Sequence, residues 1–178
     1  MTGKILFAVS LLFGVITAAA FPITDEGVPR ATIVIAADAP EPVRYAADRL
    51  QSYVRRISGA RLPIATDAEA VTGPRILVGA SRATGEHGIT AADFGEQEYL
   101  IRTVGDDLIL AGRDGEEADA VRETKGGHTF CNAKLFQAIG TVYAVNDFLM
   151  EFCGVRWFLP GELGEVIPAT PTLVVPEV

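Results

Sequence analysis

Pairs of carboxylates carry the most specific chemistry that this sequence offers, because hydrolysis of a glycosidic bond needs two carboxyl groups placed across it. The first pair, Asp106 with Asp107, lies in a predicted turn, where aspartate is favoured for backbone reasons. The second pair, Glu116 with Glu117, lies in a charged stretch. Only the third pair, Glu162 with Glu165, lies beside aromatic side chains, Trp157 and Phe158, on which a sugar ring can stack. The third pair is the candidate sugar contact, and the alternative is that both aromatics pack against the end of the preceding helix.

A serine nucleophile is the second chemistry to weigh. Residues 79–83 (GASRA) follow a predicted strand, but a nucleophile elbow needs glycine at its fifth position, where Ala83 stands. Asp107 and His128 follow Ser81 in triad order, an order that common acidic residues produce by chance. We therefore interpret residues 79–83 as a strand-to-helix turn.

Metal ligands are sparse. His87, His128, Cys131 and Cys153 lack the paired Cys-x-x-Cys spacing of a zinc site. We expect surface histidines and buried cysteines, while a Cys131–Cys153 disulfide, which an exported chain permits, stays an open alternative. The sequence therefore assigns no catalytic, cofactor-binding or metal-binding residue.

Length, charge and the first residues bound the class of protein. The 178 residues favour one domain, and the net charge of −8 without a Lys/Arg stripe speaks against nucleic acid as a partner. Lys4, the uncharged apolar run 5–20 and its final alanines have the pattern of a secretory signal peptide. A membrane anchor is the rival interpretation, because about 20 apolar residues span a bilayer. We expect cleavage after Ala20 and a secreted or periplasmic protein.

The first half of the chain predicts a strand followed by a helix. Residues 21–30 are interpreted as a polar linker, and residues 31–38 as a buried strand, because they form a nearly continuous apolar, β-branched run. The sequence DAPE, Asp38 to Glu41, resembles a capping box. Apolar residues then recur at helical spacing up to Ile57, and Gly59 is placed to end the helix.

The second half predicts a hairpin and another helix. Residues 113–130 lack a clear period and are interpreted as an exposed excursion, and a second helix is expected from Leu135 to Phe152. Together the elements predict an α+β sandwich, with a mixed, partly antiparallel sheet and two long helices packed on one face. A doubly wound nucleotide fold is disfavoured, because no glycine-rich loop follows the first strand. The remaining strands are expected at 62–65, 75–81, 98–104, 108–112 and 155–158, and the pair around Gly105 forms the hairpin.

The closing part of the chain carries a recognisable pattern: GTVYAVNDFL at 140–149, GVRWF at 154–158, then Pro160-Gly161 and Gly164-Glu165. In this pattern the chain resembles the N-terminal domain of family 67 alpha-glucuronidases, which is related to the second domain of family 20 beta-N-acetylhexosaminidases. The strand, helix and hairpin of the front half resemble that domain too. The resemblance covers about residues 31–170.

This resemblance implies a non-catalytic domain that precedes a TIM barrel, and the barrel carries the catalytic carboxylates. No catalytic residue is therefore expected here, and residues 171–178 become a tail or linker toward a barrel that this sequence does not contain, although their apolar run is also a possible strand. The implied function is an accessory domain of a secreted carbohydrate-active hydrolase, with that barrel as its partner. The alternative is a free-standing secreted module that binds carbohydrate or another protein.

We predict that export removes residues 1–20, because a charged start, an apolar centre and small residues before the cleavage point are what signal peptidases recognise. N-terminal sequencing of the exported protein should therefore begin near Phe21. An intact Met1 on mature protein extracted from membranes would contradict this prediction.

Overall fold

The centre of the protein is a five-stranded mixed sheet of order β4-β3-β5-β7-β6. The computed structural model describes residues 20–115, 121–125, 128–132 and 138–178, with only the backbone of the two short internal pieces. Four of the central strands run parallel, and β6 returns antiparallel to β7. Their bounds are β3 Thr32–Ile35, β4 Ile64–Thr66, β5 Arg75–Val78, β6 Tyr99–Val104 and β7 Asp107–Gly112.

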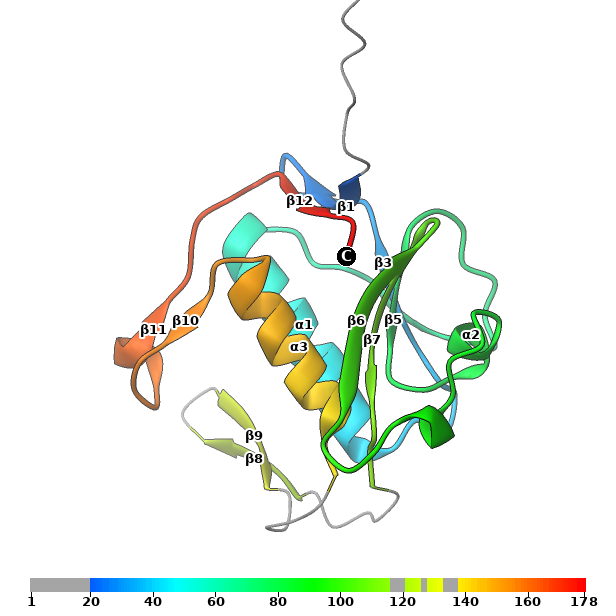
Figure 1. The fold of residues 1–178 in the computed structure, drawn as a ribbon. Coiled ribbons are helices and arrows are strands. Elements are labelled where there is room, and N and C mark those ends of the chain that lie inside the picture. Colours follow the sequence, from blue (N-terminus) through cyan, green and yellow to red (C-terminus); the bar gives the residue numbers. More distant parts are fainter. Residues whose placement is uncertain (1–19, 116–120, 126–127, 133–137) are drawn as a thin grey trace, which may run out of the picture.

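Two long helices, α1 (Glu41–Ser58) and α3 (Gly140–Glu151), cover one face of this sheet (Figure 1), as the sequence predicts. Side chains along a strand alternate between the two faces, so every second strand residue points toward the helices. Ile139, expected in the helical stripe, precedes α3 and is partly buried against the same core. The α+β architecture is confirmed. The shared core includes Ile33, Ile76, Val78, Leu108 and Leu110 from the strands and Leu50, Val54, Phe148 and Leu149 from the helices.

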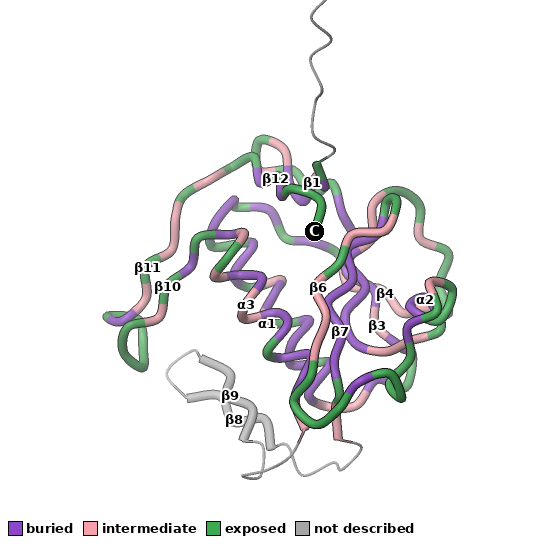
Figure 2. Tube along the Cα trace, in the orientation of Figure 1, coloured by how far each residue is buried: buried purple, intermediate pink, exposed green. Residues whose placement is uncertain are grey.

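The opposite face of the sheet is covered by an irregular segment, residues 79–97. This segment contains only the short helix α2 (Arg82–Gly85) and the 3-10 turn η1 (Ala91–Asp93). Because both faces are covered, the middle strands β3, β5 and β7 are mostly buried (Figure 2), and their sequences are nearly continuous apolar runs. The residues that meet here are Val34, Leu77, Ile109 and Ala111 from the sheet and Ala83, Ile89 and Phe94 from the segment.

Residues 21–30 are not a linker, so that prediction is wrong, and residues 171–178 contain a strand that packs on the domain. β1 (Ala20–Asp25) pairs antiparallel with β12 (Leu173–Pro176) and with β2 (Val28–Pro29) in a separate three-stranded sheet. The physical reason is burial, because apolar side chains of β1 and β12 complete the main core. These side chains are Phe21, Ile23, Leu173 and Val175.

The end of the chain is bound to the central sheet as well. The N–H of Thr103 in β6 donates to the carbonyl oxygen of Val178 at 2.7 Å, and the N–H of Val178 donates to Thr103 Oγ1 at 2.7 Å. Residue 178 therefore lies beside β1 and β6, away from the β10–β11 segment that carries the Trp157 motif (Figure 1).

The predicted capping box is wrong. α1 begins at Glu41, after Pro40, whose backbone is extended with a ψ of 161°, and no side chain caps the helix. Asp38 instead lies in a turn that the Ala39 N–H closes by donating to Ala36 O at 3.1 Å. Gly59 ends the helix in the left-handed conformation, with a φ of 82°, as expected.

Two predictions in the second half also need correction. α3 begins at Gly140 rather than at Leu135, because Ile139 still forms a β-bridge with Asp114. In the predicted excursion, the strands β8 (Val121–Lys125) and β9 (His128–Asn132) form an antiparallel hairpin. The exposure expected of their side chains lies outside what the structure describes. Residues 1–19 of the predicted signal peptide lie outside it as well. Among the described residues, no helix has the length and apolar character to cross a membrane.

Truncation of the shared core should destabilise the protein strongly. Leu50→Ala and Leu149→Ala each remove a fully buried side chain, so each should lower the free energy of unfolding by about 2–5 kcal/mol. Leu163→Ala is the matched control, because Leu163 is exposed, and it should change stability by less than about 0.5 kcal/mol. Denaturant unfolding of residues 21–178 measures all three. If both core variants lost as little free energy of unfolding as Leu163→Ala, the packing of the two helices on the sheet would be contradicted.

Candidate functional site

The hairpin that carries the Trp157 motif projects from the body of the domain (Figure 1). Its strands, β10 (Arg156–Trp157) and β11 (Glu165–Val166), pair antiparallel, and the loop between them contains the 3-10 turn η2 (Glu162–Gly164). The Phe158 N–H donates to Gly164 O at 2.8 Å, and the Gly164 N–H donates to Gly161 O at 3.0 Å. These bonds give the loop a defined shape.

Two glycines of the motif are required by that shape. A Cβ atom on Gly164 would lie 2.1 Å from the carbonyl oxygen of Leu159, so a larger residue does not fit without movement of the backbone. Gly161 has a φ of 91°, a left-handed conformation that other residues rarely adopt. The glycine spacing that distinguishes this part of the sequence is thus the spacing that closes the loop.

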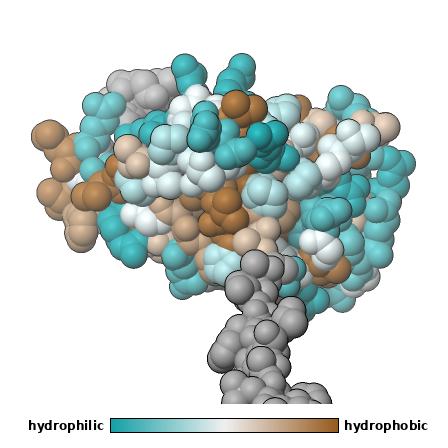
Figure 3. Space-filling model, turned by 90° about the horizontal axis from the view of Figure 1, so that it is seen from above, coloured by the Kyte–Doolittle hydropathy of each residue, from teal (hydrophilic) through white to brown (hydrophobic). Residues whose placement is uncertain are grey.

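The closed loop holds large apolar side chains in water. The exposed fractions are 103% for Leu163, 71% for Phe158, 67% for Leu159 and 55% for Val166. We call these four residues the apolar loop, and Figure 3 shows apolar side chains gathered at this edge of the molecule. Single exposed apolar residues are ordinary, but a cluster on one ordered loop is typical of an interaction surface.

Tyr53 of α1 anchors the base of the apolar loop. Its hydroxyl accepts a hydrogen bond from Trp157 Nε1 at 2.8 Å and donates to Glu165 Oε1 at 2.6 Å. The other carboxylate oxygen of Glu165 forms an ion pair with Arg56 of α1 at 2.6 Å. Burial, and next the bond to Glu165, raise the pKa of Tyr53, so the hydroxyl remains a donor at neutral pH.

Arg49 of α1 completes the anchor. Its guanidinium carbon lies 4.9 Å from the ring centroid of Tyr53 and 4.9 Å from that of Trp157, within the range of a cation–π interaction. The two rings meet edge to face, with centroids 5.3 Å apart. Arg49 Nε also donates to Asn146 Oδ1 of α3 at 2.6 Å. Both helices and β10 are therefore joined at one guanidinium.

The anchor changes the roles expected for the aromatic and acidic residues of the motif. Glu165 is engaged by Tyr53 and Arg56, so it is not presented to a sugar together with Glu162. Trp157 contacts Arg49 and Tyr53 on the first helix, while Phe158 is exposed, so the expected packing of both aromatics on the second helix is wrong.

Neither Tyr53 nor Arg49 is predicted from the sequence to belong to this site. A signal for Tyr53 was present, because it occupies the apolar stripe of α1 between Leu50 and Ile57, and a buried tyrosine hydroxyl usually needs a partner. No comparable signal existed for Arg49, whose position on the polar side of the helix resembles that of any solvated arginine.

The remaining sequence candidates have structural partners. Ser81 is the N-cap of α2, where its hydroxyl accepts from the Thr84 N–H at 3.2 Å. Asp107 accepts from Arg75 Nε at 2.7 Å and lies 2.7 Å from His87 Nε2. Burial alone raises the pKa of Asp107, but the bonds from Arg75 and His87 outweigh it and lower the pKa below its ordinary value. Asp107 and His87 thus belong to a cluster that does not include Ser81.

Some candidates lie outside the described part of the chain. These are Glu116 and Glu117, together with the side chains of His128 and Cys131. Cys153 is a buried free thiol, and burial raises its pKa to about 12. Among the residues that are described, no group of three or more His, Cys, Asp or Glu side chains is arranged to hold a metal ion.

The carboxylate of Asp67 bridges the loops that follow the carboxyl ends of the parallel strands. In open α/β sheets, ligands bind at this edge, where neighbouring crossovers diverge. Here Asp67, after β4, accepts from the Ala37 N–H through Oδ1 at 3.1 Å and from the Arg82 N–H through Oδ2 at 2.9 Å. The N–H groups of Ala37 and Arg82 lie where a nucleotide-binding fold would hold an anion, and in this protein they donate to Asp67 instead.

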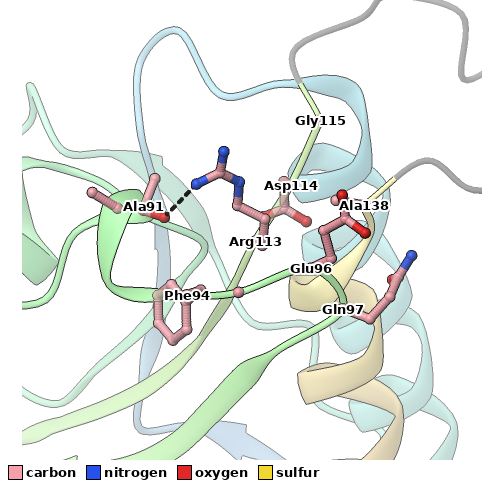
Figure 4. Close-up of a pocket in the computed structure, with 10 residues that line it drawn as sticks. Ala91, Phe94, Glu96, Gln97, Arg113, Asp114, Gly115 and Ala138 are labelled. Carbon is pink, nitrogen blue, oxygen red and sulfur yellow. Dashed lines mark hydrogen bonds between the residues drawn. The ribbon is translucent and has the colours of Figure 1, made fainter.

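A pocket of about 770 Å³ lies between η1 and the end of β7 (Figure 4). Arg113 extends across it toward Ala91 O, at 3.4 Å, and Glu96 is among its other polar side chains. The ring of Phe94 points away from these groups (Figure 4) and packs into the core between the sheet and residues 79–97. Among the described residues that line it, the pocket therefore presents charged and backbone groups, and the ring of Phe94 does not face a sugar.

Asp114, at the edge of this pocket, binds the first turn of α3. Its carboxylate accepts from the Thr141 N–H at 3.2 Å and from Thr141 Oγ1 at 2.5 Å. Desolvation of the carboxyl group raises its pKa to about 6, although the bonds from Thr141 act in the opposite direction.

Compared with known proteins, the chain matches no family model and no curated protein. The family is therefore not shown, and the likeness to alpha-glucuronidase domains remains a resemblance of sequence pattern.

Asp114 should make stability depend on pH. Its pKa is about 6 in the folded chain and 3.8 ordinarily, so the folded state holds the proton more tightly. The stability from this group is full below pH 3.8 and is lost as pH rises through about 6, a change of up to about 3 kcal/mol. Unfolding of the wild type and of Asp114→Asn, compared across this range, measures it. A wild-type-minus-variant difference that does not vary with pH would contradict the assignment.

Proposed function

We propose that this protein is a non-catalytic accessory domain of a secreted, carbohydrate-active glycoside hydrolase of alpha-glucuronidase or hexosaminidase type. The observation that carries the proposal is the apolar loop, because an ordered, exposed apolar surface suits contact with another protein domain. Its partner is the TIM-barrel domain of such a hydrolase, and its localisation is outside the cytoplasm. No nucleic acid takes part.

The architecture supports the same proposal. The resemblance implies a sheet with two helices on one side, and α1 and α3 lie on one side of the central sheet. The segment that carries the resemblance most strongly is also the segment that builds the apolar loop. Contact is thus favoured over chemistry as the role of this segment.

The arrangement of the described carboxylates also favours contact over hydrolysis. Glycoside hydrolysis needs two carboxyl groups about 5–10 Å apart around a sugar-sized cleft. Asp107 is bound by Arg75 and His87, and Glu165 by Tyr53 and Arg56, so both serve the fold.

Binding of carbohydrate at the motif, the alternative function, has less support. Trp157 is partly buried, its ring contacts Arg49, and its Nε1 donates to Tyr53. An indole in this position offers little surface for a sugar ring to stack on.

Residues 21–178 alone should hydrolyse no glycoside. The assay uses the purified protein with aryl glucuronides and aryl N-acetylglucosaminides, because these represent the two enzyme families of the resemblance. Glu162→Gln and Glu165→Gln are the matched variants, since each removes one carboxylate without changing the size of the side chain. Turnover that disappears in either variant would overturn the accessory-domain proposal.

A further inference from the structure

The apolar loop is ordered before it meets a partner. Backbone bonds from Phe158 and Gly164 close it, and Tyr53 and Arg49 hold its base against α1. A preorganised surface loses little conformational freedom on contact, so even a small apolar surface can contribute to binding. The exposed side chains are thus presented in one arrangement.

The size of the apolar loop indicates how its partner is held. A standard interface between diffusing proteins takes about 20–30 residues a side, whereas the loop offers the four exposed side chains named above. Such a contact is too small to hold a second copy of this chain, or a diffusing protein, by itself. It is sufficient where a tether or another contact already keeps the partner close, because tethering raises the effective concentration.

The shape of the apolar loop indicates the form of the partner surface. The loop projects from the helices (Figure 1), and Leu163 at its turn is fully exposed. A projecting apolar group is buried well only by a concave surface, since close packing requires complementary shapes. Two copies meeting loop to loop would present one convex surface to another.

We infer that the apolar loop inserts into an apolar hollow on the catalytic domain beside which this domain works. The inference rests on the proposed function and names the surfaces that meet. Phe158 and Leu163 fill the hollow, and Leu159 and Val166 exclude water around them, as residues at the rim of an interface do.

Photo-cross-linking of the full chain in the cells that produce it tests this inference. The photoreactive residue p-benzoylphenylalanine is placed at position 163, at the turn of the loop, and cross-linked peptides are identified by mass spectrometry. The matched control carries it at position 28, because Val28 is also apolar and exposed, at 52%, but lies on β2 in the other sheet. The expected product joins position 163 to a peptide from the catalytic barrel of a glycoside hydrolase.

A second variant checks that the apolar contact itself directs the reaction. Adding Phe158→Ser should lower the yield of the barrel cross-link about tenfold or more, as loss of a central interface residue does. Phe158 is exposed, so the midpoint of thermal unfolding should not change.

Every other outcome overturns the inference. These outcomes are a cross-link to a second copy of the chain, to a lipid, to a protein without such a barrel, or a yield no higher than at position 28. An unchanged yield in the Phe158→Ser variant does so too. The glycosidase assay separates the two proposals, because turnover by residues 21–178 refutes the proposed function, whereas a cross-link to a second copy with no turnover refutes only the docking surface.

Discussion

The four parallel strands of the central sheet, β4, β3, β5 and β7, are the constraint on which the rest of the structure depends. Parallel strands are stable when both of their faces are covered, so the chain has to supply two covers. The helices α1 and α3 form one, and residues 79–97 form the other. The outward sides of the helices then serve a second purpose, because Arg49 and Asn146 meet there and hold β10.

The helical cover could be predicted from sequence, and the irregular cover could not. The apolar stripe of α1 repeats over many turns, so its period is unmistakable, and the hairpin at Gly105 has a characteristic turn. Residues 79–97 contribute only Ala83, Ile89 and Phe94 to the core, at spacings that match no regular element. β1 could not be predicted, and β12 only as a possible strand, for a related reason. Each contributes only two apolar side chains to the core, which are too few to establish the alternation of apolar and polar residues typical of a strand.

The roles of the residues in the candidate site could also be predicted only in part from the sequence. Residue type was enough to draw attention to Trp157 and Glu165, because an aromatic and a carboxylate among glycines are unusual. Their roles depend on Tyr53, which lies 104 and 112 positions away in sequence. A pattern read along one stretch of the chain contains no information about such a partner. For the same reason Asp38 resembled a helix cap, although Pro40 extends the backbone and moves the start of α1 beyond its reach.

The pairing of β1 with β12 has a consequence for the order of folding. Thr24 Oγ1 donates to Pro171 O across 147 positions, whereas the β6–β7 hairpin joins residues that are close in sequence. Contacts between distant residues form only after a large loop has closed, so hairpins and neighbouring elements assemble more readily. During synthesis, Phe21 and Ile23 emerge from the ribosome early, but the strand that covers them is made near the end. A nascent chain therefore exposes part of its future core until almost all of the domain has been translated.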